Sequence, residues 1–579
     1  MLDAHALSIV PKLTVCSVLL VLGLSLGLGL GLGLNRGSSE ASTRPQAHLS
    51  GHNVLVIMTD DQDMLLDSLS VMPNVRELIG GQGITYEKHY CTIAWCCPSR
   101  VNFLTGKAAH NTNVTSTGLP YGGWPKFTDQ GLNENYLPVW INESDINTYY
   151  VGKFMNAYGV NNMAKPNHPK GWTDSSFLLD PWTYNYYHSR WSRGETGQID
   201  KFVGEHTTDV TERKILAMLD AAAAADNQFF MMVAPVAPHQ EIADGVHAPP
   251  PPADYQSLFL DQKAPRRLNW NPEEPSGASW VRNLPRMDQK QIKNADNTHV
   301  KRLQNLAAID DMVKNIVDKL DALGLLQSTY ILFTSDNGFH IGNHRLNPGK
   351  RCPYEEDINI PLLIRGPDTP RGVNSSLTNS HTDIAPTILD MLGVPTRADF
   401  DGAPIPYSSG PLDLSTKSEM VNVEFWTGGM NTPLGFKHNS YYNNTYKALR
   451  LVSGGHSLYY STWCTGEREF YDMDVDFAQM DNRLHIDATG EGATYFGRAE
   501  AQLVHRLDAL LMVMKGCKQD SCRLPWASIF PGGEVSDLKG AMAQKYDAFF
   551  ASQPKVSFSG CPAGHIVEME GPQELLAFT

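Results

Sequence analysis

Short runs of apolar residues alternate with amphipathic stretches along most of the chain. Runs that contain almost no polar side chain are typical of strands buried on both faces of a sheet. They lie at residues 54–58, 229–236, 330–334 and 360–364. Between them, residues 208–224 and 300–323 repeat apolar positions at helical spacing. Alternating strands and helices predict an α/β fold, with a large mixed, mostly parallel sheet flanked by helices.

The pattern changes after about residue 412. A helix packed on the core is expected over 381–392, before the change. Beyond it, we expect strands over 446–452 and 457–462 and a helix over 499–514, which indicates a smaller C-terminal α+β subdomain. The predicted organisation is therefore a leader with its linker over 1–49, a main domain over 50–412 and a C-terminal subdomain over 413–579. The Pro-rich stretch 240–300 is a surface excursion, either a lid over a site or an insertion.

The N-terminus carries an uncharged run over residues 14–34. As a helix it would be roughly 30 Å long, enough to cross a bilayer. It is either a cleaved signal peptide or an uncleaved single anchor, with the rest of the chain exported, secreted or lumenal in both cases.

Other features agree with export. Glycosylation sequons are present at Asn113, Asn142, Asn374 and Asn443. Among the nine cysteines, Cys517 and Cys522 are spaced to close a small disulfide loop, and Cys464 and Cys561 are candidates for a bridge elsewhere.

Composition and charge narrow the function. The chain has 579 residues, of which 42% are hydrophobic and 19% charged, and this composition excludes a disordered chain and a polytopic membrane protein. Lys+Arg 47 against Asp+Glu 62 gives a net charge of −15, so no nucleic-acid partner is expected. A locally basic pocket for a small anion remains compatible with this balance.

The most informative segment is 96–106, which reads CCPSRVNFLTG. Alone, it would fit a Cys-rich turn before a helix, with the proline in the first helical turn. The pattern CxPSRxxxLTG, however, resembles the signature of the type I sulfatases. In that family the first cysteine, here Cys96, is oxidised during export by a formylglycine-generating enzyme to formylglycine (3-oxoalanine). The resemblance runs from about residue 53 to 392, with weaker similarity to about 485, and implies an alkaline-phosphatase-like fold whose catalytic domain is 50–412.

Two polar pairs follow buried runs, as a metal site at a sheet edge would require. Asp60 and Asp61 follow the first run, and Asp336 and Asn337 follow the third. Alone, either pair would be interpreted as a turn or a helix cap. By the family resemblance these four residues, with the modified Cys96, bind one Ca²⁺, whose preference for hard oxygen ligands they suit.

Basic residues complete the site that the resemblance implies. Arg100 lies one helical turn after Cys96 and is expected to hold the modified side chain and the metal ligands. Lys153 in GKF, His239 in APHQ and Lys350 in PGKR match family cations that neutralise the sulfate or protonate the leaving oxygen.

One position departs from the family pattern. Many sulfatases have a histidine two residues after the GK lysine, which acts as base when sulfate is expelled, and here that position is Met155. His110 and His340 are the remaining candidates for this base.

The reaction that the resemblance implies is hydrolysis of a sulfate monoester. A hydroxyl of the hydrated formylglycine attacks sulfur, and the second hydroxyl allows the covalent sulfate to be expelled. The alternatives are a phosphate or phosphonate ester hydrolase, and an inactive protein that binds sulfated glycans. The segment 462–484 resembles glucosamine-6-sulfatases and fungal arylsulfatases, so the expected substrate is an aryl sulfate, with a carbohydrate sulfate second. Aromatic residues at Trp182, Tyr184, Tyr186, Tyr187 and Trp191 either line a subsite or pack in a loop-rich region.

Overall fold

The computed structural model describes residues 51–164, 167–409, 418–427, 443–485 and 492–578. The expected leader at 14–34 and its linker lie outside these ranges, as does the predicted boundary between residues 412 and 413. Within the described part, no helix combines the length and the apolarity that crossing a membrane demands.

An eight-stranded sheet forms the centre of the fold. Its strand order is β13-β2-β12-β11-β1-β8-β4-β5. The strands are β1 (Asn53–Thr59), β2 (Gly83–Tyr86), β4 (Asn147–Gly152), β5 (Asp174–Phe177), β8 (Phe229–Ala234), β11 (Thr329–Ser335), β12 (Leu362–Arg365) and β13 (Val373–Ser375). Pairing is parallel except where β12 runs antiparallel to β11 and β2. The prediction of a large mixed, mostly parallel sheet is confirmed, and all four apolar runs enter it.

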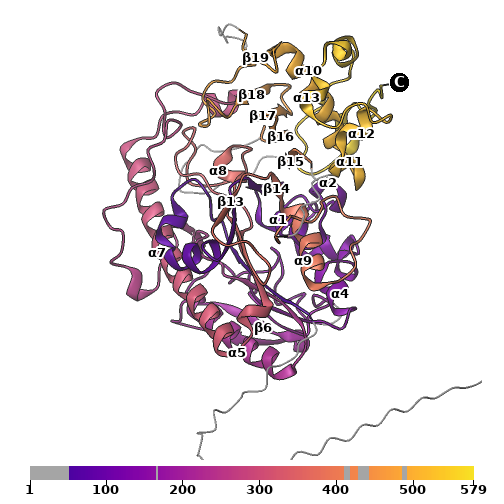
Figure 1. Cartoon of the computed structure of the whole chain (residues 1–579). Coiled ribbons are helices and arrows are strands. Elements are labelled where there is room, and N and C mark those ends of the chain that lie inside the picture. Colours follow the sequence, from indigo (N-terminus) through magenta and orange to yellow (C-terminus); the bar gives the residue numbers. More distant parts are fainter. Residues whose placement is uncertain (1–50, 165–166, 410–417, 428–442, 486–491, 579) are drawn as a thin grey trace, which may run out of the picture. The chain divides into compact units, whose positions relative to one another are not determined.

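Two helical layers cover the sheet (Figure 1). Helices α1 (Cys96–Thr105), α4 (Leu137–Asn142) and α9 (Ile384–Leu392) pack on one face, where Val54, Val56 and Met58 of β1 point. Helices α5 (Thr207–Ala225) and α7 (Gln289–Ala322) pack on the other, against Leu55 and Ile57. Both faces of β1 are thus buried, which explains its unbroken apolar run.

Helix α7 begins earlier than its apolar periodicity predicts. The periodicity starts near residue 300, whereas the helix starts at Gln289. A capping box starts it, because the Asp288 side chain accepts from the Gln291 amide and the Gln291 side chain accepts from the Asp288 amide. The first turns carry few buried side chains, so they show no hydrophobic pattern.

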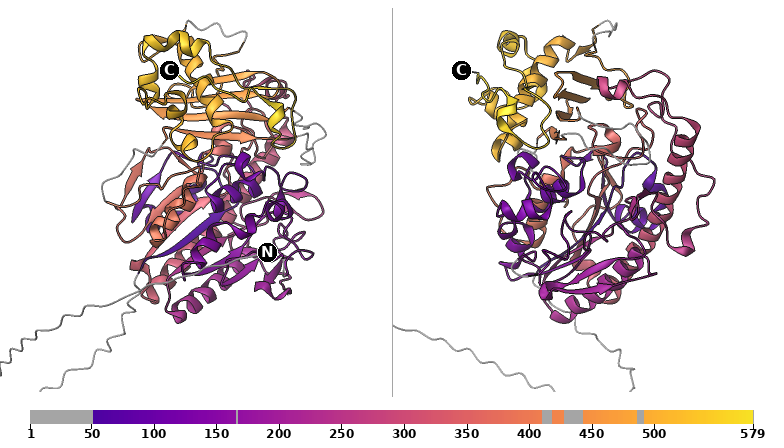
Figure 2. Two further views of the ribbon diagram at one scale, coloured as in Figure 1. Left: turned by 90° about the vertical axis from the view of Figure 1, so that its right-hand side faces the viewer. Right: turned by 180° about the vertical axis from the view of Figure 1, so that it is seen from behind.

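The C-terminal region contains a second, antiparallel sheet. It is built from β15 (Met420–Phe425), β16 (Tyr446–Ser453), β17 (His456–Trp463) and β18 (Arg468–Asp472) in that order. One face packs on α10 (Glu500–Met514) and its neighbouring helices, drawn in yellow beside the orange strands in Figure 2. The other face packs on residues 90–95 and 358–360 of the first part. The expected strands and helix are confirmed here.

The remaining elements are short. The helices are α2 (Ala109–Thr112), α3 (Gly123–Asp129), α6 (Ser279–Arg282), α8 (Glu355–Ile358), α11 (Asp520–Arg523), α12 (Pro525–Ile529), α13 (Leu538–Ala541) and α14 (Asp547–Ala551). The strands, paired two by two, are β3 (His89–Tyr90) with β14 (Asn379–Ser380), β6 (Arg190–Arg193) with β7 (Gln198–Lys201), β9 (Glu241–Ile242) with β10 (Val246–His247), β19 (Thr494–Tyr495) with β20 (Arg498–Ala499), and β21 (Ser557–Phe558) with β22 (Glu570–Gly571).

Two disulfides lie in the C-terminal region. Cys517 pairs with Cys522 as their spacing predicts, and Cys464 pairs with Cys561. The Cys464–Cys561 bridge joins residues 97 positions apart and connects the end of β17 to the C-terminal segment.

Candidate active site

The carboxyl ends of four neighbouring parallel strands form the floor of the site. In the order β11, β1, β8 and β4, each strand is followed within five residues by one or two of the predicted side chains. Parallel strands end at the same edge of a sheet, so residues far apart in sequence meet there. The side chains are Asp336 and Asn337 after β11, Asp60 and Asp61 after β1, His239 after β8, and Lys153 after β4.

The two polar pairs are in direct contact. Thr59 and Ser335 are paired in register, which places the residues that follow them side by side. The Asp61 amide donates to Asp336 Oδ1 at 3.0 Å, and Asn337 Nδ2 donates to Asp61 Oδ1 at 2.8 Å. All four side chains of the two pairs are buried.

Cys96 opens helix α1 above this floor. Its thiol is 3.6 Å from Asp60 Oδ1 and 2.7 Å from Lys350 Nζ, and the residue is 2% exposed. Burial, together with the nearby Asp60 carboxylate, raises the pKa of the Cys96 thiol to about 12. The unmodified thiol is therefore protonated at neutral pH and is a weak nucleophile.

Arg100 lies one turn further along α1 and connects three parts of the floor. Its NH2 donates to Asp60 Oδ2 at 3.1 Å, its Nε donates to Asp336 Oδ2 at 2.9 Å, and its NH1 donates to the Lys153 carbonyl at 2.7 Å. The rigid, planar guanidinium suits these three directions, which an ammonium could not satisfy together.

Two lysines bring positive charge to the same point. Lys153 forms an ion pair with Asp60, and Lys350 forms one with Asp61 and lies 3.5 Å from Asn337 Oδ1. Burial alone would lower the pKa of the Lys153 ammonium, but Asp60 outweighs it and raises that pKa. Both lysines are therefore charged.

His239 presents one ring nitrogen to the site. Nδ1 lies 2.6 Å from the Gln240 carbonyl, to which it donates, so Nε2 faces Asp61 Oδ2 at 3.7 Å. Burial lowers the pKa of the imidazole, against the opposing effect of Asp61 and Asp60.

The Asp60 and Asp61 carboxylates remain ionised although they are buried. Burial alone would raise the pKa of Asp60, but Lys153, His239 and Arg100 outweigh it and the pKa is lowered. The pKa of Asp61 is lowered in the same way, with burial opposed by Lys350 and His239. Carboxylate oxygens of Asp60 and Asp61 lie within 4.8 Å of each other and of Cys96 and His239, and Asp336 contacts the Asp61 amide beside them. Asn337 turns its amide nitrogen to Asp61, and its Oδ1 lies 3.5 Å from Lys350 Nζ. These oxygen donors fit a divalent cation such as Ca²⁺.

The two histidines proposed as bases, His110 and His340, lie in different parts of the structure. His110 lies in the C-terminal interface, where Glu424 holds Nδ1 at 2.8 Å and the Cys517 carbonyl holds Nε2 at 2.8 Å. His340 instead pairs its backbone with Gly349, next to Lys350, and its Nδ1 contacts Asp357 Oδ1 at 2.8 Å. The Met155 side chain is buried in the core under α1.

Most of the aromatic residues noted in the segment 182–191 pack against the core, which was one of the two alternatives for them. Tyr186 and Trp191 are fully buried beside α5 and α7. Tyr184 is different, because it contacts both Lys153 and His239. Sequence spacing gave no sign of this contact, since the three residues come from separate segments. Of the sequon residues, Asn142, Asn374 and Asn443 are exposed and Asn113 is half-buried.

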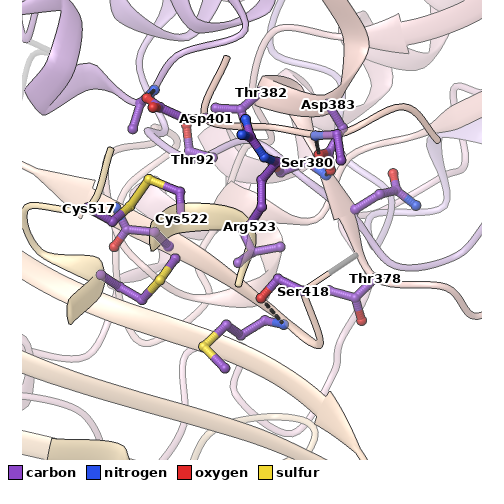
Figure 3. Close-up of a pocket in the computed structure, with 17 residues that line it drawn as sticks. Thr92, Thr378, Ser380, Thr382, Asp383, Asp401, Ser418, Cys517, Cys522 and Arg523 are labelled. Atoms are coloured by element: carbon purple, nitrogen blue, oxygen red, sulfur yellow. Dashed lines mark hydrogen bonds between the residues drawn. A yellow bond between two sulfur atoms is a disulfide. The ribbon is translucent and has the colours of Figure 1, made fainter. Parts of the chain in front are cut away.

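A separate small cavity of about 50 Å³ lies between the first part and the C-terminal region (Figure 3). Its wall includes the Cys517–Cys522 disulfide, Asp383 and Asp401. Both carboxylates are already occupied, Asp383 by the Ala403 amide and Asp401 by the Ala108 and Gln519 amides. None of the predicted site residues lines this cavity, and we assign it a structural role.

Comparison with known proteins agrees with this geometry. The family model described as Sulfatase matches residues 52–394. The chain is 32% identical to an arylsulfatase of Volvox carteri over 88% of this chain and 81% of that protein. It is 30% identical to the human N-acetylglucosamine-6-sulfatase over 82% of this chain and 86% of that one. A solved protein in complex with its substrate D-glucosamine-2-N,6-O-disulfate shares the fold, with a TM-score of 0.61 at 21% identity, over 75% of this chain and 94% of that chain.

The fold and the site thus define a hydrolase of the alkaline-phosphatase-like class. Within that class, the chain belongs to the sulfatase family and is a sulfuric ester hydrolase.

Proposed function

We propose that the chain is an arylsulfatase that cleaves sulfate monoesters at Cys96 after this residue is oxidised to formylglycine. One observation carries the proposal: the Cys96 side chain lies 3.6 Å from a buried carboxylate of Asp60 and 2.7 Å from the ammonium of Lys350. When formed, the formylglycine would supply a hydrated aldehyde whose hydroxyl attacks sulfur.

A bound Ca²⁺ belongs to the same proposal. Asp60, Asp61, Asp336 and Asn337 would hold it beside residue 96, and their oxygen donors suit this ion. When bound, the cation would polarise the sulfate group.

The surrounding residues divide the remaining work. Arg100 fixes Asp60 and Asp336, so the carboxylates do not move as charge develops. Lys153 and Lys350 neutralise the sulfate oxygens, since both ammonium groups reach the floor of the site. His239 turns Nε2 toward the floor and would exchange a proton with the departing oxygen, a role that Lys350 could share.

The substrate class follows from the relatives. The Volvox arylsulfatase aligns over 88% of this chain, and an aryl sulfate is therefore our first choice. A carbohydrate 6-sulfate is the second candidate, supported by the human N-acetylglucosamine-6-sulfatase that aligns over 82%.

We also propose that the protein enters the secretory pathway, where it would meet the formylglycine-generating enzyme. The two disulfides and the exposed sequon residues Asn142, Asn374 and Asn443 support an oxidising compartment. Relatives named extracellular sulfatases are in agreement. Glycan analysis of the protein expressed in a eukaryotic host tests this, and unmodified sequons with reduced cysteines would contradict it.

The central experiment has two readings on one preparation. Peptide mass spectrometry should find an aldehyde at position 96, and turnover should be faster on 4-nitrophenyl sulfate than on 4-nitrophenyl phosphate. N-acetylglucosamine-6-sulfate in the same series distinguishes the two sulfate classes. The variant Cys96→Ala is the matched control and should be inactive. Phosphatase activity without sulfatase activity, or full activity in Cys96→Ala, would overturn the proposal.

A further inference from the structure

Tyr184 lies between the Lys153 ammonium and the His239 imidazole, which follow different strands. Its ring is 4.3 Å from the His239 ring between centroids, with 32° between the planes, and Lys153 Nζ lies 4.7 Å from the Tyr184 ring centroid. The residue is 9% exposed, so little water competes for these contacts. The face of an aromatic ring is electron-rich and attracts a positive charge.

The loop after Lys153 fixes the orientation of this ring. Asn156 Nδ2 donates to the Tyr184 hydroxyl at 2.6 Å. Met155, one residue earlier, turns into the core, so Asn156 is the next side chain of this loop that reaches the site. The segment 153–156 thus contributes both the Lys153 ammonium and the Asn156 amide that orients the Tyr184 ring.

The loop that carries His239 is tied to the same tyrosine segment. The Ile242 amide donates to the Tyr184 carbonyl at 3.1 Å, and the Tyr186 hydroxyl donates to the His239 carbonyl at 2.6 Å. Movement of Tyr184 would therefore displace the imidazole as well as the ammonium. Lys153 and His239 lie after β4 and β8, and the Tyr184 ring contacts both.

From this arrangement we propose that Tyr184, oriented by Asn156, is a positioning residue for sulfate ester hydrolysis. Its aromatic face holds the Lys153 ammonium and the His239 imidazole in the directions that the reaction needs. The inference rests on the proposed function, because it assigns Tyr184 a part in the same site. It requires the ring, while the hydroxyl serves only to set the ring's angle.

The ring and the hydroxyl can be separated by substitution. Tyr184→Phe keeps the ring and should lower kcat by no more than about threefold. Tyr184→Leu removes the ring and should lower kcat by about tenfold or more, since one desolvated cation–aromatic contact is of that order. KM should change less than kcat, because Tyr184 acts through groups that engage the reacting bond. The loss should be larger for an aryl sulfate with a poor leaving group than for 4-nitrophenyl sulfate, because a poor leaving group depends more on the proton exchange proposed for His239.

Double variants test whether Tyr184 acts through its neighbours. In a Lys153→Ala background, Tyr184→Leu should cost less than it does in the wild type. Asn156→Ala should lower kcat by a few fold alone and add nothing to Tyr184→Phe, because the hydrogen bond is already absent there. This second pair keeps the question open to test even if Tyr184→Leu folds poorly.

Tyr187→Leu is the matched control, since Tyr187 lies in the same segment but contacts His206 and the Pro251 carbonyl instead. It should leave kcat unchanged. A wild-type enzyme without sulfatase activity would overturn the proposed function. An active wild type in which Tyr184→Leu equals Tyr184→Phe, or in which the double variants are additive, would overturn the role of Tyr184.

Discussion

Arg100 offers the sharpest test of how the floor of the site is held. We consider Arg100→Met, which keeps the length and much of the apolar volume of the side chain but removes every donor. The change leaves Asp60 and Asp336 without their guanidinium, and it removes one of the two donors to the Lys153 carbonyl, which keeps the Tyr150 hydroxyl.

The size of the effect follows from these contacts. Hydrogen bonds to charged groups contribute about 1.5–3 kcal/mol each, and Arg100 makes two of them, to carboxylates that are fully buried. Their sum, about 3–6 kcal/mol, agrees with the roughly 3–5 kcal/mol lost when one partner of a buried ion pair is removed. Arg100→Lys should lose about half as much, since one ammonium cannot reach all three acceptors.

The assay combines stability with turnover of the folded enzyme. Arg100→Met should lower the thermal midpoint and should also lower kcat by about a hundredfold or more, because both carboxylates lose their fixed direction. Arg506→Met is the matched control, because Arg506 is also buried but lies in α10 of the C-terminal region. Its guanidinium donates to the Ala541 carbonyl and to Asp547. Arg506→Met should cost stability and leave kcat unchanged. Wild-type kcat in Arg100→Met, or an equal loss in Arg506→Met, would refute the reasoning.

Three further predictions concern the metal, pH and a tight turn. Chelation with EGTA should abolish activity and added Ca²⁺ should restore it, and full activity after exhaustive chelation would contradict the calcium assignment. Burial alone would lower the pKa of His110, but Glu424 outweighs it and raises the pKa, so this pair stabilises the fold below about pH 6.5 and its contribution is lost as pH rises through the folded-state pKa. His110→Gln should therefore lower the thermal midpoint more at pH 5.5 than at pH 9, and an equal loss at both would contradict the ion pair. Gly106→Ala should cost about 1–3 kcal/mol, because its φ is 65° and a Cβ there would lie 2.4 Å from the Phe400 ring. Gly131→Ala, at φ 70° in open space, should cost less in the same melts, and equal costs would show that the ring contact is unimportant.

The sequence predicts best those side-chain contacts that follow from the pairing of neighbouring strands. The apolar run of β1 indicates a strand buried on both faces, and such strands lie inside a mixed sheet with their carboxyl ends at one edge. The polar pairs after β1 and β11 could be expected to meet for that reason, and the register of Thr59 with Ser335 brings them into contact. Local pattern and sheet geometry are sufficient here.

Hydrophobic periodicity predicts the start of a helix poorly where the first turns are polar and are stabilised by an N-terminal cap. The first turns of α7 contain few buried side chains, and the helix starts there because of the capping box at Asp288 and Gln291. The apolar periodicity therefore predicts a start at residue 300, eleven residues after the helix begins at Gln289.

Neither apolar strand runs nor helical periodicity predicts the contacts between loops. Lys153 directly follows β4 and His239 follows β8 closely, so the sheet brings them to the same edge without fixing their side chains. Their directions depend on Tyr184, which comes from the segment after β5, and on Asn156 behind it. Such contacts depend on how loops of irregular conformation pack, and no periodicity encodes that. Asp60, Asp61, Asp336 and Asn337 thus lie at the ordered edge of the sheet, where the pattern of apolar and polar residues predicts them. The residue that we propose to position Lys153 and His239 lies in a loop, where only the three-dimensional structure brings it into view.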